Sequence, residues 1–172
     1  AELAELKFMT VFDIALISSA FLCTLVAGFL FAYAVVVMPG IRNFNDKQFI
    51  EAFQVTDRVI QDNHPVFLFV WLGSIIAIIA CIISGFAKLQ GFDFALLLVA
   101  TAGYLVGVQI STIVVHLPLN NKIQTYDAKT MSDEELCAAR KKFEPRWNRS
   151  NKIRTIIACC VSFLLIVLAV RQ

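Results

Sequence analysis

Four long apolar segments dominate the pattern of hydrophobic and polar positions along this chain. Each reaches the roughly 18 residues that an α-helix needs to cross the hydrocarbon core of a bilayer. The segments run over about Val11–Met38, Val66–Phe86, Phe94–Val115 and Ile153–Val170. The last helix is expected to begin earlier than its apolar segment, at Pro145, because proline suits the first turn of a helix. The pattern predicts an all-α fold: a four-transmembrane-helix bundle in a single membrane domain (1–172), with spans of about 11–38, 66–86, 94–115 and 145–170.

A short amphipathic helix is predicted after the first span. Asn45 is a suitable N-cap, and a helix over about 46–61 places apolar side chains on one face. That face is formed by Phe49, Ile50, Phe53, Thr56 and Ile60. The charged residues are expected to point elsewhere; they are Lys47, Glu51, Asp57 and Arg58. Such a helix can lie at the membrane interface or cover one end of the bundle.

The last loop carries the signature of a capped helix. Ser132 followed by Glu135 is a capping-box pattern, and the acidic first turn and basic last turn match the helix dipole. We therefore predict a helix over about 132–142, which Pro145 separates from the final span. Proline is expected to interrupt two other helices, because it lacks the backbone N–H: Pro39 ends the first span and Pro118 breaks the third.

Small residues recur at four-residue steps in three of the spans. Such rows let membrane helices approach closely, so we interpret them as the contact lines of the bundle. The rows are Ala20, Thr24, Gly28 and Ala32; Gly73, Ala77, Cys81 and Gly85; and Gly103, Gly107 and Ser111.

Composition agrees with a membrane protein and excludes a soluble domain. Hydrophobic residues make up 59% of the chain and charged residues only 16%, far from the balance of a soluble surface. We therefore expect an integral, multi-pass membrane protein with lipids as its immediate partners. No basic stripe with interleaved aromatic residues is present, so nucleic acid is not an expected partner.

Charge distribution predicts the orientation of the bundle. Four spans place both termini on one side, together with Lys7, Lys88 and Arg171, whereas the other twelve lysines and arginines fall on the opposite side. The positive-inside rule then assigns the two larger loops to the cytosol. Nothing in the sequence identifies the organelle.

Polar residues of separate spans converge at one end of the bundle. Gln109, Thr112 and His116 share a helix face, and Asn120 and Asn121 follow directly after Pro118. On the final helix a polar face is formed by Trp147, Asn151, Arg154 and Thr155. Ionisable groups within a membrane are costly without a role, so these residues together indicate a pocket.

Two short motifs resemble one family of membrane proteins. The runs PLNN (Pro118–Asn121) and RWNRSNKIRT (Arg146–Thr155) are similar to the hallmark of the anthrone-oxygenase-like family of four-helix membrane proteins. The segments Gly28–Gly40 and Phe49–Gln61 resemble the first half of that family. The chain departs from the family's pattern at Ser150, where members carry a second tryptophan, and at His116. The resemblance implies oxygenation of polyketide anthrones to anthraquinones.

Together with these residues, the resemblance implies an oxygenase or redox enzyme for a flat, hydrophobic phenolic or quinone-like substrate. His116 is the expected base, because its side chain titrates near neutral pH, and the resulting anion would react with dioxygen. Arg154, Asn120 and Asn151 would hold the developing oxyanion. Trp147 and Tyr33 would stack on the rings. The other candidate substrate-binding residues are Gln109, Thr112 and Asn121.

Two alternatives stay open at this stage. We expect no cofactor, but a metal site built from His64, His116 and Asp62 is conceivable, although the spacing of the two histidines is not that of a common metal motif. The chain could instead be a non-catalytic subunit of a larger membrane complex, or a lipid- or quinone-binding protein. Its polar cluster would then be a structural network or a passive binding site.

Overall fold

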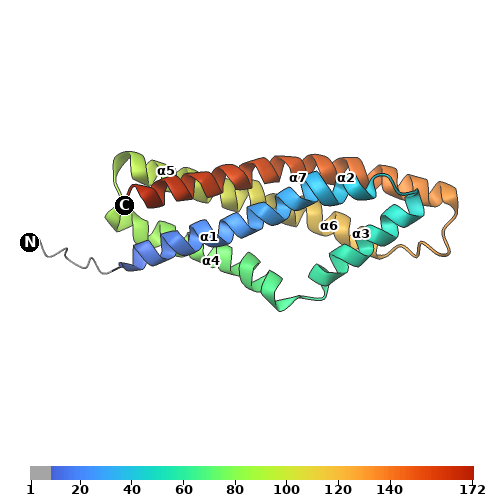
Figure 1. Cartoon of the computed structure of the whole chain (residues 1–172), viewed down its shortest axis with the longest axis horizontal. Coiled ribbons are helices and arrows are strands. Elements are labelled where there is room, and N and C mark those ends of the chain that lie inside the picture. The colour runs from blue at the N-terminus through green and yellow to red at the C-terminus, as the bar shows by residue number, and fades with distance from the viewer. Residues whose placement is uncertain (1–8) are drawn as a thin grey trace, which may run out of the picture.

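The structure is a computed structural model that describes residues 9–172, and every regular element in this range is helical. Four continuous helical segments are long and apolar enough to span a membrane: Val11–Ile41, Pro65–Lys88, Gly91–Gln124 and Asp133–Val170. Their elements are α1 (Val11–Ala32), α2 (Met38–Ile41), α4 (Pro65–Lys88), α5 (Gly91–Ala102), α6 (Leu117–Gln124) and α7 (Asp133–Val170), with α3 (Asp46–Gln61) outside the four segments. The predicted all-α, four-span fold is confirmed (Figure 1).

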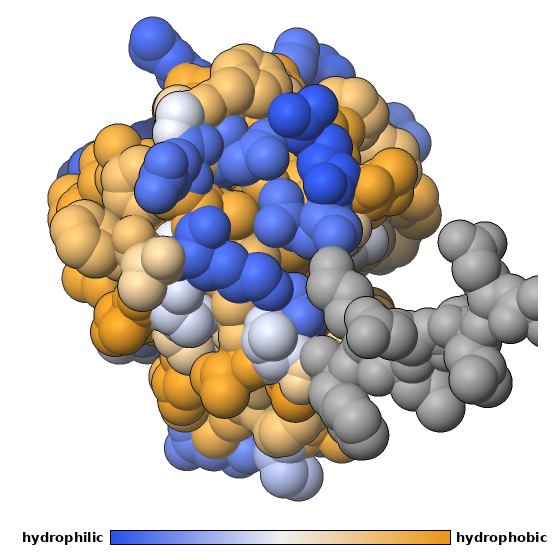
Figure 2. Space-filling model, turned by 90° about the vertical axis from the view of Figure 1, so that its left-hand side faces the viewer, coloured by the Kyte–Doolittle hydropathy of each residue, from blue (hydrophilic) through white to orange (hydrophobic). Residues whose placement is uncertain are grey.

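The four long segments lie side by side, and α1 begins at the same end of the bundle at which α7 finishes (Figure 1). Two ion pairs cross this end, Lys88 with Asp13 at 2.7 Å and Arg171 with Asp93 at 2.6 Å. In Figure 2, which faces this end, hydrophilic side chains gather at the middle and hydrophobic ones surround them. Lys7, used above to predict the orientation, lies outside the described residues.

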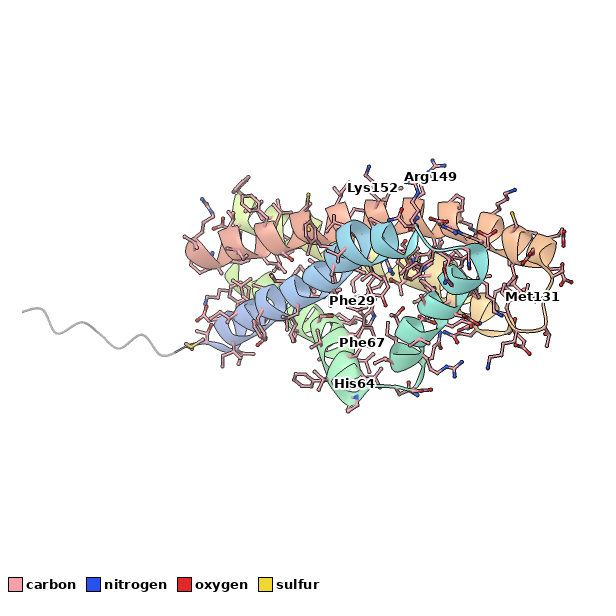
Figure 3. All side chains as sticks on the ribbon, turned by 45° about the vertical axis from the view of Figure 1, so that its right-hand side comes forward. Phe29, His64, Phe67, Met131, Arg149 and Lys152 are labelled. Carbon is pink, nitrogen blue, oxygen red and sulfur yellow. The ribbon has the colours of Figure 1, made fainter. Side chains whose placement is uncertain are left out.

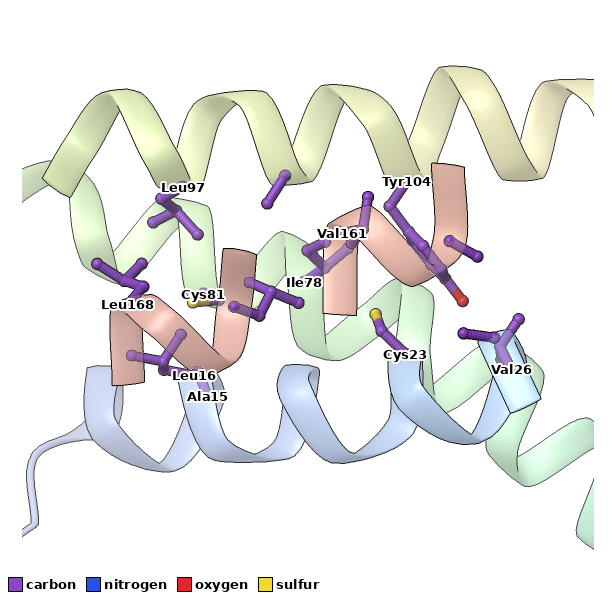
Figure 4. Close-up of a cluster of buried hydrophobic side chains, with 14 of the residues drawn as sticks. Ala15, Leu16, Cys23, Val26, Ile78, Cys81, Leu97, Tyr104, Val161 and Leu168 are labelled. Atoms are coloured by element: carbon purple, nitrogen blue, oxygen red, sulfur yellow. The ribbon is translucent and has the colours of Figure 1, made fainter. Parts of the chain in front are cut away.

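The membrane core of the bundle is apolar and closely packed (Figure 4). Side chains from all four segments meet there, among them Leu16, Ile78, Leu97 and Leu165, each 2% exposed or less. Many large apolar side chains instead face outward, including Phe21, Phe69 and Phe163. A hydrophobic exterior around an apolar interior is what a bilayer requires, because lipid solvates the outer face.

Two of the three predicted small-residue rows form helix contacts. A Cβ at Gly85 would meet Leu97 Cδ2 at 2.6 Å, and a Cβ at Gly107 would meet Ile157 Cγ2 at 2.8 Å. The prediction is wrong for the row of the first span, because nothing lies within 4 Å of a Cβ at Gly28. The neighbouring row is buried instead; it consists of Ala15, Ser19, Cys23 and Ala27.

The expected interruptions at three prolines do not occur. Pro145 lies inside α7, which runs unbroken from Asp133 to Val170, so the predicted 132–142 helix is the first part of this long helix. The buried stripe of α7 keeps its helical period on both sides of the proline; it includes Leu136, Ala139, Phe143, Trp147, Asn151 and Arg154. Continuous packing along this stripe outweighs the loss of one backbone hydrogen bond, whose carbonyl can be solvated because Pro145 is exposed.

The other two prolines, Pro39 and Pro118, lie just after π-helical stretches, in which the turns are wider than in an α-helix. The first helix passes through a π-helical stretch, Tyr33–Val37, and continues past Pro39 to Ile41. The third passes through π-helical stretches at Gly103–Ile110 and Thr112–His116, and continues past Pro118 to Gln124. A proline in the first turn of α2 or α6 loses little, since the wider turn before it already redirects the backbone bonds.

The amphipathic helix α3 has the predicted bounds and lies at the end of the bundle opposite the start of α1 and the end of α7 (Figure 1). Asn45 caps it by accepting from the Gln48 N–H at 2.9 Å. Its apolar face, with Phe49, Ile50 and Phe53 buried, packs against α6 and the first half of α7. Arg140 of α7 holds the connection to α3 by donating to the carbonyls of Arg42 and Phe44.

Candidate functional site

Arg154 lies at the centre of the polar cluster, buried to 5% exposure on α7. Its Nε donates to Oδ1 of Asn151 at 3.0 Å, and its Nη1 donates to Oγ1 of Thr112 at 3.0 Å. Cζ of its guanidinium lies 5.8 Å from the ring centroid of Trp147. Arg154 forms no ion pair within residues 9–172, and Nη2 has no protein acceptor there. Arg154 is therefore a buried cation without a direct ion pair among the described residues.

A hydrogen-bonded chain connects the final helix to α3. Trp147 Nε1 donates to Oδ1 of Asn120 at 2.9 Å, and Asn120 Nδ2 donates to Oδ1 of Asp57 at 2.7 Å. The second carboxylate oxygen of Asp57 accepts from Gln124 at 3.0 Å and from Gln61 at 3.2 Å. Asp57 is thus fixed by amide groups from α3 and α6.

The burial of Asp57 corrects the prediction made for α3. Its side chain was expected on the solvated face, but it is only 2% exposed, whereas Thr56, expected on the buried face, is exposed. Phe49, Phe53 and Asp57 are spaced by four residues and therefore share one helix face. This spacing was the signal in the sequence that could have identified Asp57 as a site residue.

A small cavity of about 30 Å³ lies between Arg154 and Asp57. Its remaining lining residues are Phe29, Tyr33, Phe53, Ile60, Asn120 and Trp147. Of the residues predicted for the site, the structure thus brings Arg154, Asn120, Trp147 and Tyr33 to one cavity. Asn151 and Thr112 hold Arg154 from outside the lining. The cavity combines a cation, a carboxylate, an amide and aromatic rings in a volume that suits a water molecule or dioxygen.

Aromatic rings continue from this cavity toward α4. Phe29 lies 5.0 Å from Tyr33 and 5.4 Å from Phe67, and Phe67 stacks on Trp71 at 5.4 Å between ring centroids. Figure 3 shows Phe29 on α1 and Phe67 on α4 between their two helices, beside the region where α4 diverges from α3. Phe67 and Trp71 are partly exposed. The row therefore connects the cavity with the outer surface of the bundle.

His116 lies beside this cavity and is not part of its lining. It is 2% exposed, its ring meets that of Trp147 edge-on at 5.0 Å, and its Nε2 is 3.0 Å from Oγ of Ser150. The two positions at which the chain departs from the family's pattern are therefore in contact. Ser150 in turn lines a groove of about 580 Å³ between the third helix and α7, with Ser111 and Gly107 opposite.

Two other predicted substrate-binding residues lie apart from the cavity. Gln109 is buried one turn before Thr112, and its Nε2 has no hydrogen-bond partner in the part of the chain that the structure describes. Asn121 is exposed and accepts from Gln61 at 3.2 Å. Neither side chain lines the cavity between Arg154 and Asp57.

The suggested metal site of His64, His116 and Asp62 is wrong as a cluster. His64 and Asp62 are exposed in the turn between α3 and α4, and His64 is labelled at the outer corner of that turn in Figure 3, whereas His116 is buried against Trp147. Within residues 9–172 no three histidine, cysteine or acidic side chains are grouped as metal ligands. The reason is that α4 begins away from the bundle and carries His64 with it.

A comparison with known protein families gives a match for this chain. The sequence profile of a protein family described as anthrone oxygenase matches residues 66–165, more than half of the chain. This range contains both motifs, Pro118–Asn121 and Arg146–Thr155, whereas the similar segments of the first half, Gly28–Gly40 and Phe49–Gln61, lie before it. No curated protein and no solved structure matches the chain.

Proposed function

Because the chain belongs to the anthrone oxygenase family, we propose that it is a membrane oxygenase for a flat, hydrophobic phenol or anthrone. The observation that carries the proposal is the buried guanidinium of Arg154, without an ion pair in residues 9–172, at a cavity lined by aromatic rings and Asp57. A buried guanidinium without a carboxylate partner is costly, and an anionic ligand offsets that cost. The enolate or phenolate of an aromatic ketone is such a ligand, with rings that suit Trp147, Tyr33 and Phe29.

Arg154 and Asn120 are the proposed oxyanion-binding groups. Arg154 and Asn120 line the same cavity. Nη2 of Arg154 has no acceptor among the described residues, and Nδ2 of Asn120 uses one of its two hydrogens on Asp57, so both groups retain a donor for an oxygen on which negative charge develops. Asn151 and Thr112 act as positioning residues, because their oxygen atoms occupy Nε and Nη1 and fix the direction of Nη2. Preorganised donors of this kind contribute to catalysis because they need no reorientation as charge appears.

Asp57 is the proposed base, in place of His116. A carboxylate offers about four acceptor positions, of which amides occupy three here, so one remains for a substrate proton. His116 directs Nε2 to Ser150 and does not line the cavity. Asp57 removes a proton from the ring methylene or hydroxyl of the substrate, and Arg154 holds the resulting anion. The anion then reduces dioxygen, one oxygen atom becoming a ring carbonyl and the other leaving in water.

The substrate rings reach the cavity along the aromatic row from α4. The present cavity of about 30 Å³ takes dioxygen but no tricyclic substrate, so the rings must displace side chains that border it. Phe29 and Phe67 are the natural choice, because they lie between the cavity and the outer surface.

A direct assay tests this function. Detergent-purified protein is incubated with anthrone, and oxygen uptake and anthraquinone formation are measured against the spontaneous reaction and against Arg154→Gln. We expect one oxygen molecule consumed per quinone formed, at a rate that Arg154→Gln lowers to near the spontaneous level. Equal rates for the wild type, the variant and buffer would refute the proposal.

The small cavity supports a second candidate, a non-catalytic membrane subunit in which Arg154 belongs to a structural network. Such a protein would show no oxygen uptake above buffer and would retain a companion protein through purification in mild detergent. Arg154→Gln would then lower the melting temperature without any effect on turnover. The same preparation therefore distinguishes the two functions.

A further inference from the structure

A second polar groove lies on the outside of the bundle. It shares no lining residue with the Arg154 cavity, although Asn151 at its inner end accepts a hydrogen bond from Arg154. It has a volume of about 400 Å³ and runs between the end of the first helix and α7. Arg42 stands on one wall and Lys152 on the other, with Asn148 beside Lys152 and Asn151 at the inner end. The part nearer the membrane centre is apolar and includes Ala34, Val35 and Met38.

The two cations of this groove are free of acidic partners. Neither Arg42 nor Lys152 forms an ion pair among the residues that the structure describes, and neither side chain has a hydrogen bond there. Both are exposed. Arg140, in contrast, pairs with Asp46 and Glu144. The groove therefore presents two positive charges toward a single opening.

The groove lies where the outer surface changes from apolar to charged. Val36 and Ile153 are exposed hydrophobic residues, at 64% and 52%, and the next exposed positions on the same helices include Arg42, Arg149 and Lys152. Figure 3 shows Lys152 and Arg149 projecting outward from α7 near the end of the first helix. This change marks the level of lipid headgroups, since apolar side chains face acyl chains and basic ones face phosphates.

We propose that this groove binds an anionic phospholipid, with the phosphate between Arg42 and Lys152 and an acyl chain along Val35 and Val36. Basic pockets between membrane helices recognise anionic headgroups by this combination of charge and apolar surface. The amide of Asn148 is a further donor at the same opening. The proposal does not depend on the oxygenase function.

Competitive lipid binding tests the proposal. Purified protein is titrated with equimolar phosphatidylglycerol and phosphatidylcholine of identical chains, and the bound lipids are counted by native mass spectrometry. The wild type should retain phosphatidylglycerol in excess. The double variant Arg42→Gln/Lys152→Gln should lose about 30-fold in affinity for phosphatidylglycerol, as expected for two surface cations, and should bind phosphatidylcholine as before.

A matched control separates a defined site from a general attraction to anionic membranes. Arg146→Gln/Arg149→Gln removes two exposed cations near the same level of α7, but these residues line the other groove. This variant should keep the preference for phosphatidylglycerol. Equal losses in both double variants, or a wild type without preference, would overturn the proposal. So would full displacement of the lipid by millimolar inorganic phosphate, which would indicate a site for free phosphate.

Discussion

Asn151 connects Arg154 to the backbone of the first helix. Its Oδ1 accepts from Nε of Arg154 at 3.0 Å, one turn away on α7, and its Nδ2 donates to the carbonyl of Leu30 at 3.3 Å. The guanidinium is therefore oriented by two helices at once, with Thr112 of the third helical segment as another acceptor. This arrangement fixes the direction of a charge that has no carboxylate partner in residues 9–172.

The oxygen of Thr112 should be required for turnover. Thr112→Val keeps the shape of the side chain but leaves Nη1 of Arg154 without its acceptor, at a cost of about 1–3 kcal/mol. We expect kcat to fall by roughly tenfold or more, because the guanidinium is no longer held in one direction. Thr112→Ser retains the hydroxyl and should retain the rate. Oxygen uptake by the two variants checks this, and equal rates would contradict the positioning role.

A positive charge at position 154 should not be sufficient for turnover without the hydrogen bonds of the guanidinium. Arg154→Lys keeps a cation but loses the hydrogen bonds to Asn151 and Thr112 that orient it. We expect a fall in kcat of about 10²–10³, the effect typical for loss of one oxyanion donor. The measurement is steady-state turnover of anthrone, together with a melting curve. A lysine variant with wild-type turnover would show that direction is unimportant.

Variants of Asp57 and His116 distinguish the two candidate bases. Asp57→Asn should abolish turnover, whereas His116→Gln should retain it within a fewfold, because only Asp57 lines the cavity. Gln54→Ala is the control for docking of α3, since Gln54 donates to the carbonyls of Ile123 and Tyr126 and lies outside the cavity. It should lower the melting temperature and leave kcat unchanged. Loss of turnover in His116→Gln alone would instead support the histidine.

The aromatic row should control access for the substrate. Phe67→Ala removes the ring between Phe29 and Trp71, so we expect a several-fold change in KM for a tricyclic substrate and an unchanged kcat. Phe69→Ala is the matched control, because Phe69 is 70% exposed on the same helix and has no ring partner in the described part of the chain. Identical KM values for both variants and the wild type would exclude this route.

Glycine variants test the packing of the bundle. Gly85→Ala places a Cβ 2.6 Å from Leu97 and should destabilise the protein by about 1–3 kcal/mol through overpacking. Gly28→Ala meets nothing within 4 Å and should be neutral or slightly stabilising, since alanine favours the helix by about 1 kcal/mol. Thermal unfolding in detergent measures both. A melting temperature for Gly85→Ala at or above that of Gly28→Ala would contradict the described contact.

Sequence reasoning predicted some of the spatial relations at this end of the bundle and missed others. The convergence of Arg154, Trp147, Asn120 and Tyr33 followed from their places at one end of the spans, because a spanning helix fixes the depth of each residue. Its rotation about its own axis is not fixed in this way. Gln109 and Asn121 were therefore placed in a pocket that they do not line, and Asp57 was missed although its spacing from Phe53 indicated the buried face.

The sequence by itself determined the four spans, the amphipathic helix and both of its predicted bounds, because apolar length and capping residues act locally. The tertiary structure alone decided that α7 continues through Pro145, that Asp57 is buried and that His64 lies far from the cluster. These features depend on contacts between distant parts of the chain, such as the hydrogen bond from Asn120 to Asp57 across 63 positions. Packing between helices selects their tilt and their final rotation, which the local pattern constrains only in part.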